Sequence, residues 1–191
     1  MRRFVLGIMA CALVVSFQGL GADEPKEEAK QPEKTVVVNS QAPAFQIKDS
    51  QGKLVDLKKL TAKGPVLVRL TCGCSGCDKE LAYFQSLHKA YSGKGLTSLA
   101  IFRMPDEKVE EYVKQKKLNM LYAVDKEGKS WATFQTKTMP TNFLIEKGGR
   151  IRSIAAGCDP NGLIANILSE KVADLLGTET VELKKATPEE K

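Results

Sequence analysis

Apolar residues along the chain follow two different periods. Short runs rich in β-branched residues and leucine, as at 66–70, are typical of buried strands. In other stretches, as at 81–91, apolar residues recur every three or four positions and predict helices that bury one face. The two patterns alternate along most of the sequence. We therefore expect an α/β fold.

The expected elements follow one another without an internal repeat. Strands are expected at 35–38, 66–70, 97–102, 121–124, 139–145 and 150–156. Helices are expected at 77–91, from Pro105 onward, at 131–135 and from Pro160 to Gly177, with one helical turn at 57–60. A β-hairpin that turns at Gly52 lies before the 66–70 strand. Because a helix connects the 66–70 and 97–102 strands, we expect these two strands to be parallel.

The last helix has its own start signal and apolar stripe. Asp159 is the expected N-cap, with Pro160 in the first helical position, where its missing N–H is tolerated. The residues expected on its buried face are Leu163, Ile164, Ile167, Leu168, Val172, Leu175 and Leu176. Elsewhere, Trp131 is interpreted as a packing residue rather than a binding residue.

The two ends of the chain differ in composition from the middle. Residues 1–22 combine two arginines, an apolar run and small residues, which is the pattern of a secretory signal peptide. This predicts export to the periplasm or cell envelope, although an uncleaved segment would instead form an N-terminal membrane anchor. Residues 23–39 are expected to form a charged linker and 178–191 a polar tail. One domain is thus expected over 40–177.

Charge and histidine content exclude some functions. Removing Arg2 and Arg3 from the 29 basic residues leaves 27 against 23 acidic residues, a net charge of +4. No cluster of basic residues is interleaved with aromatic residues, so nucleic-acid binding is not expected. His88 is the single histidine of the sequence, which excludes a metal site built on several histidines. No cofactor is expected.

The chemistry is concentrated between the 66–70 strand and the helix that follows. There Cys74-Ser75-Gly76-Cys77 places one cysteine at the N-terminus of the helix and another one turn further on. Unpaired amides and the helix dipole favour a thiolate at such a position. A lower thiol pKa raises the fraction of nucleophile and improves the leaving group. A CxxC motif in this setting is typical of thiol–disulfide exchange.

The order of these motifs resembles a known family. The Ala42-Pro43-Ala44-Phe45 segment, the Gly52 hairpin, the CxxC motif and the Met139-Pro140 strand occur in its order. Over about residues 40–176 the chain resembles the thioredoxin-like superfamily. Within it, the chain is most similar to exported disulfide reductases of the cytochrome c maturation type, near the alkyl hydroperoxide reductase/thiol-specific antioxidant (redoxin) group. The resemblance implies a mixed central sheet flanked by helices, with the hairpin as an N-terminal extension.

The resemblance also implies roles for individual residues. Cys74 would attack a substrate disulfide, and Cys77 would resolve the mixed disulfide. Pro140 would be a cis-proline beside the pair, with the backbone of Met139 and the Gly73 position contacting the substrate. The implied activity is that of a thiol–disulfide oxidoreductase. Its partners would be a protein disulfide and a thiol electron donor.

The sequence departs from the family pattern in three respects. Gly73 stands where the family usually has a tryptophan, and Ser75-Gly76 replaces the common Gly-Pro dipeptide. Arg69 stands where thioredoxins often have a buried aspartate. Its cation would either stabilise a thiolate from beneath the site or extend to solvent at the edge of the sheet.

Two further cysteines leave alternatives open. Cys72 and Cys158 are candidates for additional redox thiols, and Cys158 is alternatively a small buried residue. Cys72, Cys74 and Cys77, with or without Cys158, would also suit a copper or zinc module, since thiolates bind both metals. A redoxin-type peroxidase is a third alternative, because Thr71 lies three residues before Cys74. The proline that this family has four residues before the threonine is replaced by Leu67.

Overall fold

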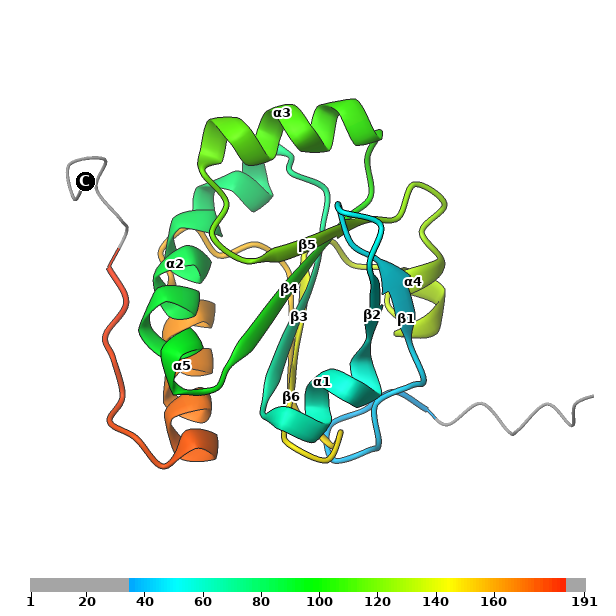
Figure 1. Ribbon diagram of the computed structural model, residues 1–191. Coiled ribbons are helices and arrows are strands. Elements are labelled where there is room, and N and C mark those ends of the chain that lie inside the picture. Colours follow the sequence, from blue (N-terminus) through cyan, green and yellow to red (C-terminus); the bar gives the residue numbers. More distant parts are fainter. Residues whose placement is uncertain (1–34, 185–191) are drawn as a thin grey trace, which may run out of the picture. The chain divides into compact units, whose positions relative to one another are not determined.

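The computed structural model describes residues 35–184 (Figure 1). The predicted signal peptide, most of the predicted linker and the tail from residue 185 lie outside this range. Within it, no helix is both long and apolar enough to cross a membrane.

A five-stranded mixed sheet forms the centre of the structure, in the order β5-β4-β3-β6-β7. The strands are β3 (Val66–Thr71), β4 (Thr97–Phe102), β5 (Leu121–Val124), β6 (Thr141–Ile145) and β7 (Ile151–Ala156). β3, β4 and β5 are parallel to one another, while β6 and β7 add as antiparallel strands. The predicted α/β class and the parallel pairing of the first two strands are confirmed.

Helices cover both faces of this sheet (Figure 1). One face packs against α2 (Ser75–Tyr91), α3 (Asp106–Lys116) and α5 (Leu163–Leu176), with a short 3-10 helix, η1 (Ser92–Lys94), after α2. The other face packs against α1 (Leu57–Lys63), α4 (Lys129–Thr133) and the hairpin strands β1 (Gln46–Lys48) and β2 (Leu54–Asp56). The predicted hairpin is therefore confirmed as a separate two-stranded sheet.

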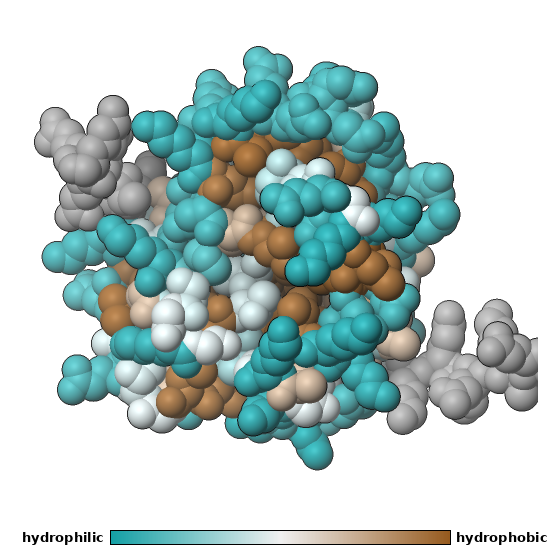
Figure 2. Space-filling model, viewed as in Figure 1, coloured by the Kyte–Doolittle hydropathy of each residue, from teal (hydrophilic) through white to brown (hydrophobic). Residues whose placement is uncertain are grey.

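The apolar core is divided by the sheet into two clusters. Leu67, Phe84 and Leu87 belong to the cluster under α2 and α5. Val68 and Trp131 belong to the cluster under α1 and α4, which confirms Trp131 as a packing residue. The outer surface of α3 carries charged side chains, and hydrophilic residues gather over it at the top of Figure 2.

Two predictions are wrong: the strand at 35–38 and the start of the last helix. Residues 35–38 do not form a strand, because the chain turns there: Ser40 Oγ accepts a hydrogen bond from Val37 N at 3.1 Å. Helix α5 begins at Leu163 rather than Pro160, because Gly162 adopts a left-handed φ of 82° at the N-cap. Asp159 lies in the preceding loop, where its side chain accepts from Asn161 N and also from Ile164 N in the first turn of α5.

The predicted stripe of α5 and the predicted polar tail also need correction. Leu163 and Ile167 are exposed, because the buried face of the helix runs through Ala165, Leu168 and Val172 and these two residues, four apart, lie on its outer side. Residues 178–184, in contrast, pack against the domain. Leu183 is buried and its N–H donates to Asn166 Oδ1 at 2.7 Å. The segment also hydrogen-bonds at Val181, whose N–H donates to the hydroxyl of Tyr91.

Candidate active site

The site is built where strand β3 passes into helix α2. All six residues of β3 are buried, so the strand is a fixed base for the loop that follows it. Gly73 has a φ of 63°, a left-handed conformation that glycine adopts without strain. A Cβ atom there would lie 3.1 Å from the sulfur of Met104 and 3.5 Å from the ring of Tyr112. This close packing explains why a tryptophan is absent from this position.

The loop brings three thiols together. Cys74 is the N-cap of α2 and is exposed, Cys77 lies one turn inside the helix and is buried, and Cys72 is half-buried. Cys77 Sγ lies 3.6 Å from Cys74 Sγ and also 3.6 Å from Cys72 Sγ. The predicted pair is thus within reach of a disulfide, with a third thiol beside it.

A fourth cysteine, Cys158, lies in the connection between β7 and α5 and contacts the first turn of α2. Cys158 is exposed, and its thiol donates a hydrogen bond to Gly76 O at 2.7 Å. Its sulfur is not part of the cluster that Cys72, Cys74 and Cys77 form. The prediction of an inert buried residue is wrong for Cys158.

The surroundings shift the thiol pKa values of Cys74 and Cys72 in opposite directions. Hydrogen bonding from the Cys72 thiol, with further donation from the Cys77 backbone amide, lowers the pKa of Cys74 to about 7. Burial raises the pKa of Cys72 to about 12, and its hydrogen bond to Cys74 adds to the increase. Cys74 is therefore better suited than Cys72 to act as a nucleophile, because it is exposed and its thiol is the more acidic of the two.

Pro140 lies next to this loop across the sheet. The Met139–Pro140 peptide bond is cis, as the resemblance implies. β3 and β6 pair Leu70 with Thr141, so Pro140 follows in register beside Thr71 and the cysteine loop. Met139, half-buried, precedes it at the rim of the site. The predicted substrate-side residues thus lie at the same end of the sheet as the thiols.

Arg69 is held beneath the site by buried partners. The residue is 2% exposed, so the prediction that its side chain extends to solvent is wrong. Its guanidinium donates to Glu80 Oε1 at 2.6 Å, to Asn142 Oδ1 at 2.9 Å and to Cys77 O at 3.4 Å. It also lies over the Phe84 ring, 4.2 Å from the centroid. Because Glu80 neutralises it, Arg69 is not a free cation facing a thiolate.

Glu80 is the residue of this site that the sequence interpretation missed. It is 1% exposed, and its second oxygen accepts from Asp159 N at 2.8 Å. A signal was present, since Glu80 lies three residues after Cys77 and four before Phe84, both on the buried face of α2. A carboxylate on an apolar helix face requires a buried partner, and Arg69 supplies it.

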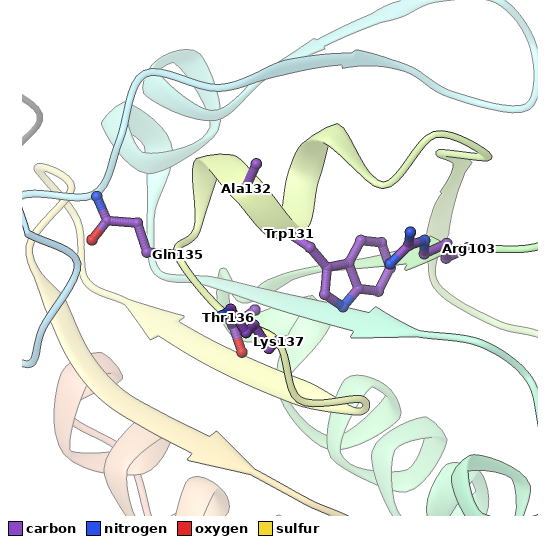
Figure 3. A pocket seen from close by; sticks show the side chains of 6 residues that line it. All are labelled: Arg103, Trp131, Ala132, Gln135, Thr136 and Lys137. Atoms are coloured by element: carbon purple, nitrogen blue, oxygen red, sulfur yellow. The ribbon is translucent and has the colours of Figure 1, made fainter.

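A pocket opens beside the end of β4, away from the thiols. Figure 3 shows its lining residues, Arg103, Trp131, Ala132, Gln135, Thr136 and Lys137. The guanidinium of Arg103 lies 5.9 Å from the centroid of the Trp131 ring. The chain from Thr136 and Lys137 leads directly to Pro140, so the pocket borders the loop that enters the site.

The fold and the paired thiols define a thioredoxin-like protein with a candidate dithiol site. The sequence profile described as the AhpC/TSA family matches residues 38–154, which include Cys74, Cys77 and Pro140. The chain belongs to the AhpC/TSA family. The predicted resemblance is confirmed at this level.

Relatives and solved structures agree with this assignment. The thiol-disulfide oxidoreductase ResA of Bacillus cereus is 32% identical over 152 residues, which cover 78% of this chain and 83% of the relative. The structure of a Chlorobium tepidum protein assigned as a thiol:disulfide interchange protein DsbE superposes with a TM-score of 0.68 at 22% identity, covering 74% of this chain and 99% of that one.

The structure of a peroxidoxin has the same fold. Peroxidoxin BcpB of Mycobacterium tuberculosis superposes with a TM-score of 0.59 at 20% identity, covering 73% of this chain and 96% of that one. At this identity the likeness concerns the fold alone, so the peroxidase alternative stays a prediction. Consumption of hydrogen peroxide by the purified protein would test it.

Proposed function

We propose that the chain is a thiol–disulfide oxidoreductase in which Cys74 and Cys77 form the working dithiol. The main supporting observation is that the exposed Cys74 sulfur lies 3.6 Å from the buried Cys77 sulfur at the start of α2. An exposed thiol can reach a protein substrate, whereas a buried one reacts only with its neighbour. The ResA relatives, named as thiol-disulfide oxidoreductases, support the same class of enzyme.

The reaction proceeds in two exchanges. The Cys74 thiolate attacks one sulfur of a substrate disulfide; a new S–S bond forms, and the leaving substrate thiolate takes up a proton. Cys77 then loses its proton and attacks Cys74 Sγ, which releases the second substrate thiol. Two electrons have passed to the substrate, and Cys74 and Cys77 are joined. A dithiol donor restores them by the reverse exchanges.

The substrate contacts and cellular location are part of the same proposal. Met139 directly precedes the cis Pro140 and Gly73 lies between Cys72 and Cys74, and both would contact the backbone of a bound substrate segment. The leader predicted at residues 1–22 supports a location in the periplasm or cell envelope. The substrate is a protein disulfide, and the donor is a thiol protein of the same compartment.

Reduction of insulin by dithiothreitol, with catalytic amounts of the protein, tests the proposal. We expect Cys74→Ser to abolish catalysis, because no other exposed thiol of the cluster can attack. Cys77→Ser should accumulate a mixed disulfide on Cys74, because the resolving thiol is missing. Cys158→Ser is the matched control, since serine also donates to Gly76 O, and it should retain activity. Activity of Cys74→Ser equal to that of the wild type would refute the assignment.

A further inference from the structure

Cys72 has no part in the two exchanges, although its sulfur belongs to the same cluster. The Sγ atoms of Cys72, Cys74 and Cys77 all lie within 4.8 Å of one another. The three cysteines lie where β3 passes into α2: Cys72 directly follows the fully buried strand, Cys74 is the N-cap of the helix, and Cys77 lies in its first turn. Their spacing is therefore set by the fold.

The spacing matches the coordination sphere of a thiolate-bound metal ion. A metal–thiolate bond of about 2.3 Å, the length known for zinc, places the sulfurs about 4.0 Å apart around a trigonal ion. Cys77 Sγ lies 3.6 Å from each of the other two sulfurs. Shifts of a few tenths of an ångström, within the reach of side-chain rotation, would complete the site.

We propose that the reduced protein binds one Cu(I) ion through Cys72, Cys74 and Cys77. The choice of ion follows from the number and softness of the ligands. Thiolates select Cu(I), zinc or iron–sulfur clusters, and structural zinc sites almost always have four protein ligands. Over residues 35–184, no other cysteine, histidine or carboxylate joins the cluster. Three soft ligands without a fourth favour Cu(I).

Binding and disulfide exchange use the same sulfurs. Coordination replaces thiol protons by the metal and leaves the oxidation state of sulfur and copper unchanged. Cys74 and Cys77 cannot coordinate the ion while they are joined to each other. The ion therefore binds the dithiol form only and inhibits the exchange reaction. This inhibition rests on the proposed function, whereas the binding itself does not.

Anaerobic titration of the reduced full-length protein with Cu(I), in competition with bicinchoninate, tests the site. We expect one equivalent to bind to the wild type and none to the protein with a Cys74–Cys77 disulfide. Loss of one ligand in Cys72→Ser should weaken the binding by at least about tenfold. Cys158→Ser, which removes a thiol of the β7–α5 connection outside the cluster, should bind as the wild type does. Binding of less than about a tenth of an equivalent by the wild type would overturn the proposal.

A second measurement covers the case in which Cys72→Ser does not fold. X-ray absorption on the copper-loaded wild type should show three sulfur ligands at about 2.2–2.3 Å. Two sulfur ligands would contradict the role of Cys72, and tighter binding of zinc than of Cu(I) would contradict the choice of ion. If the wild type does not catalyse insulin reduction but binds copper as described, the proposed function is refuted and the metal site is supported. The reverse result removes the metal site alone.

Discussion

The two faces of strands β3 and β6 are built from different chemistry, although both are buried. The face toward α1 and α4 is apolar except for Thr141 at the start of β6. Its apolar side chains are Val66, Val68, Leu70, Phe143 and Ile145. Toward α2 the same strands present Leu67 and Leu144, and then Arg69 and Asn142 nearest the thiols. On the helical side, Glu80 and Phe84 of α2 contact Arg69 of this second face.

The comparison separates the part that holds the fold from the part that positions the site. The apolar face depends on volume and tolerates substitutions that conserve it. The polar face depends on every partner at once, because a buried charge without its counter-charge is costly. Arg69 and Glu80 together join β3, β6, α2 and the Asp159 loop beneath the thiols. We therefore expect the two faces to respond differently to substitution.

The largest effect is expected on the polar face. Glu80→Leu leaves the Arg69 cation buried without its carboxylate and should lower the free energy of unfolding by about 3–5 kcal/mol. Urea denaturation measures this loss. The matched control is Glu127→Leu, which breaks an ion pair of the same 2.6 Å length between side chains that are mostly exposed. Because solvent screens an exposed ion pair, the control should leave the free energy of unfolding nearly unchanged.

Replacing both members of the buried pair sharpens this prediction. In Arg69→Met/Glu80→Leu no unpaired charge remains, so the loss should be smaller than in Glu80→Leu alone. Equal losses in the double and single variants would mean that packing, and not charge pairing, determines stability on this face.

The next largest effect is expected on the apolar face. Leu99 is fully buried in β4, and Leu99→Ala should lower the free energy of unfolding by about 2–4 kcal/mol through lost contacts and a cavity. Leu99→Met, which conserves volume, should lose less than about 1.5 kcal/mol. If the methionine variant were as unstable as the alanine variant, the apolar face would not tolerate volume-conserving substitutions. This would contradict the proposed difference between the apolar and the polar face.

A smaller effect is expected where the C-terminal segment docks. The hydroxyl of Tyr91 accepts from Val181 N at 2.8 Å and lies 2.8 Å from Ser169 Oγ. Tyr91→Phe should lower the free energy of unfolding by about 1–2 kcal/mol, because Val181 N loses its acceptor. Hydrogen exchange should become faster at Val181 and Leu183 and remain unchanged in β3. Unchanged exchange in the segment would show that other contacts hold it.

The smallest effect concerns pH. Burial lowers the pKa of His88, so the folded protein binds a proton there less readily than the unfolded chain. Its contribution to stability is complete above a pH of about 6.5 and declines as the pH falls toward the folded-state pKa. His88→Gln should flatten the dependence of the urea midpoint on pH between about 7 and 5. A slope identical to that of the wild type would assign the dependence to carboxylates.

Most of the fold followed from local sequence pattern. The 97–102 and 121–124 strands coincide with β4 and β5, because unbroken apolar runs between turns have few alternatives. The start of α5 did not follow, because the Asp159 side chain accepts from Ile164 N in the first turn of the helix from three residues before its N-cap, Gly162. The docking of Val181 and Leu183 depends on partners on α2 and α5 that lie far away in the sequence.

Some features of the site were likewise predicted from the sequence, and others were not. The CxxC pair was evident from spacing, and the cis bond at Pro140 was implied by the family resemblance. The role of Arg69 could not be decided from the sequence, because its environment depends on Glu80, which lies eleven residues further along the chain. The contact of Cys72 with Cys77 depends on the left-handed turn at Gly73, which a sequence pattern does not fix.

Titration of the metal-free protein in glutathione buffers, with mass mapping of the remaining thiols, tests the central claim most directly. We expect Cys74 and Cys77 to form a disulfide in one two-electron step, while Cys72 and Cys158 remain free thiols that can be alkylated. A midpoint near about −270 mV would indicate a reductant, and one near about −120 mV an oxidant. A disulfide between Cys72 and Cys158, or failure of Cys74 and Cys77 to close, would contradict the dithiol mechanism.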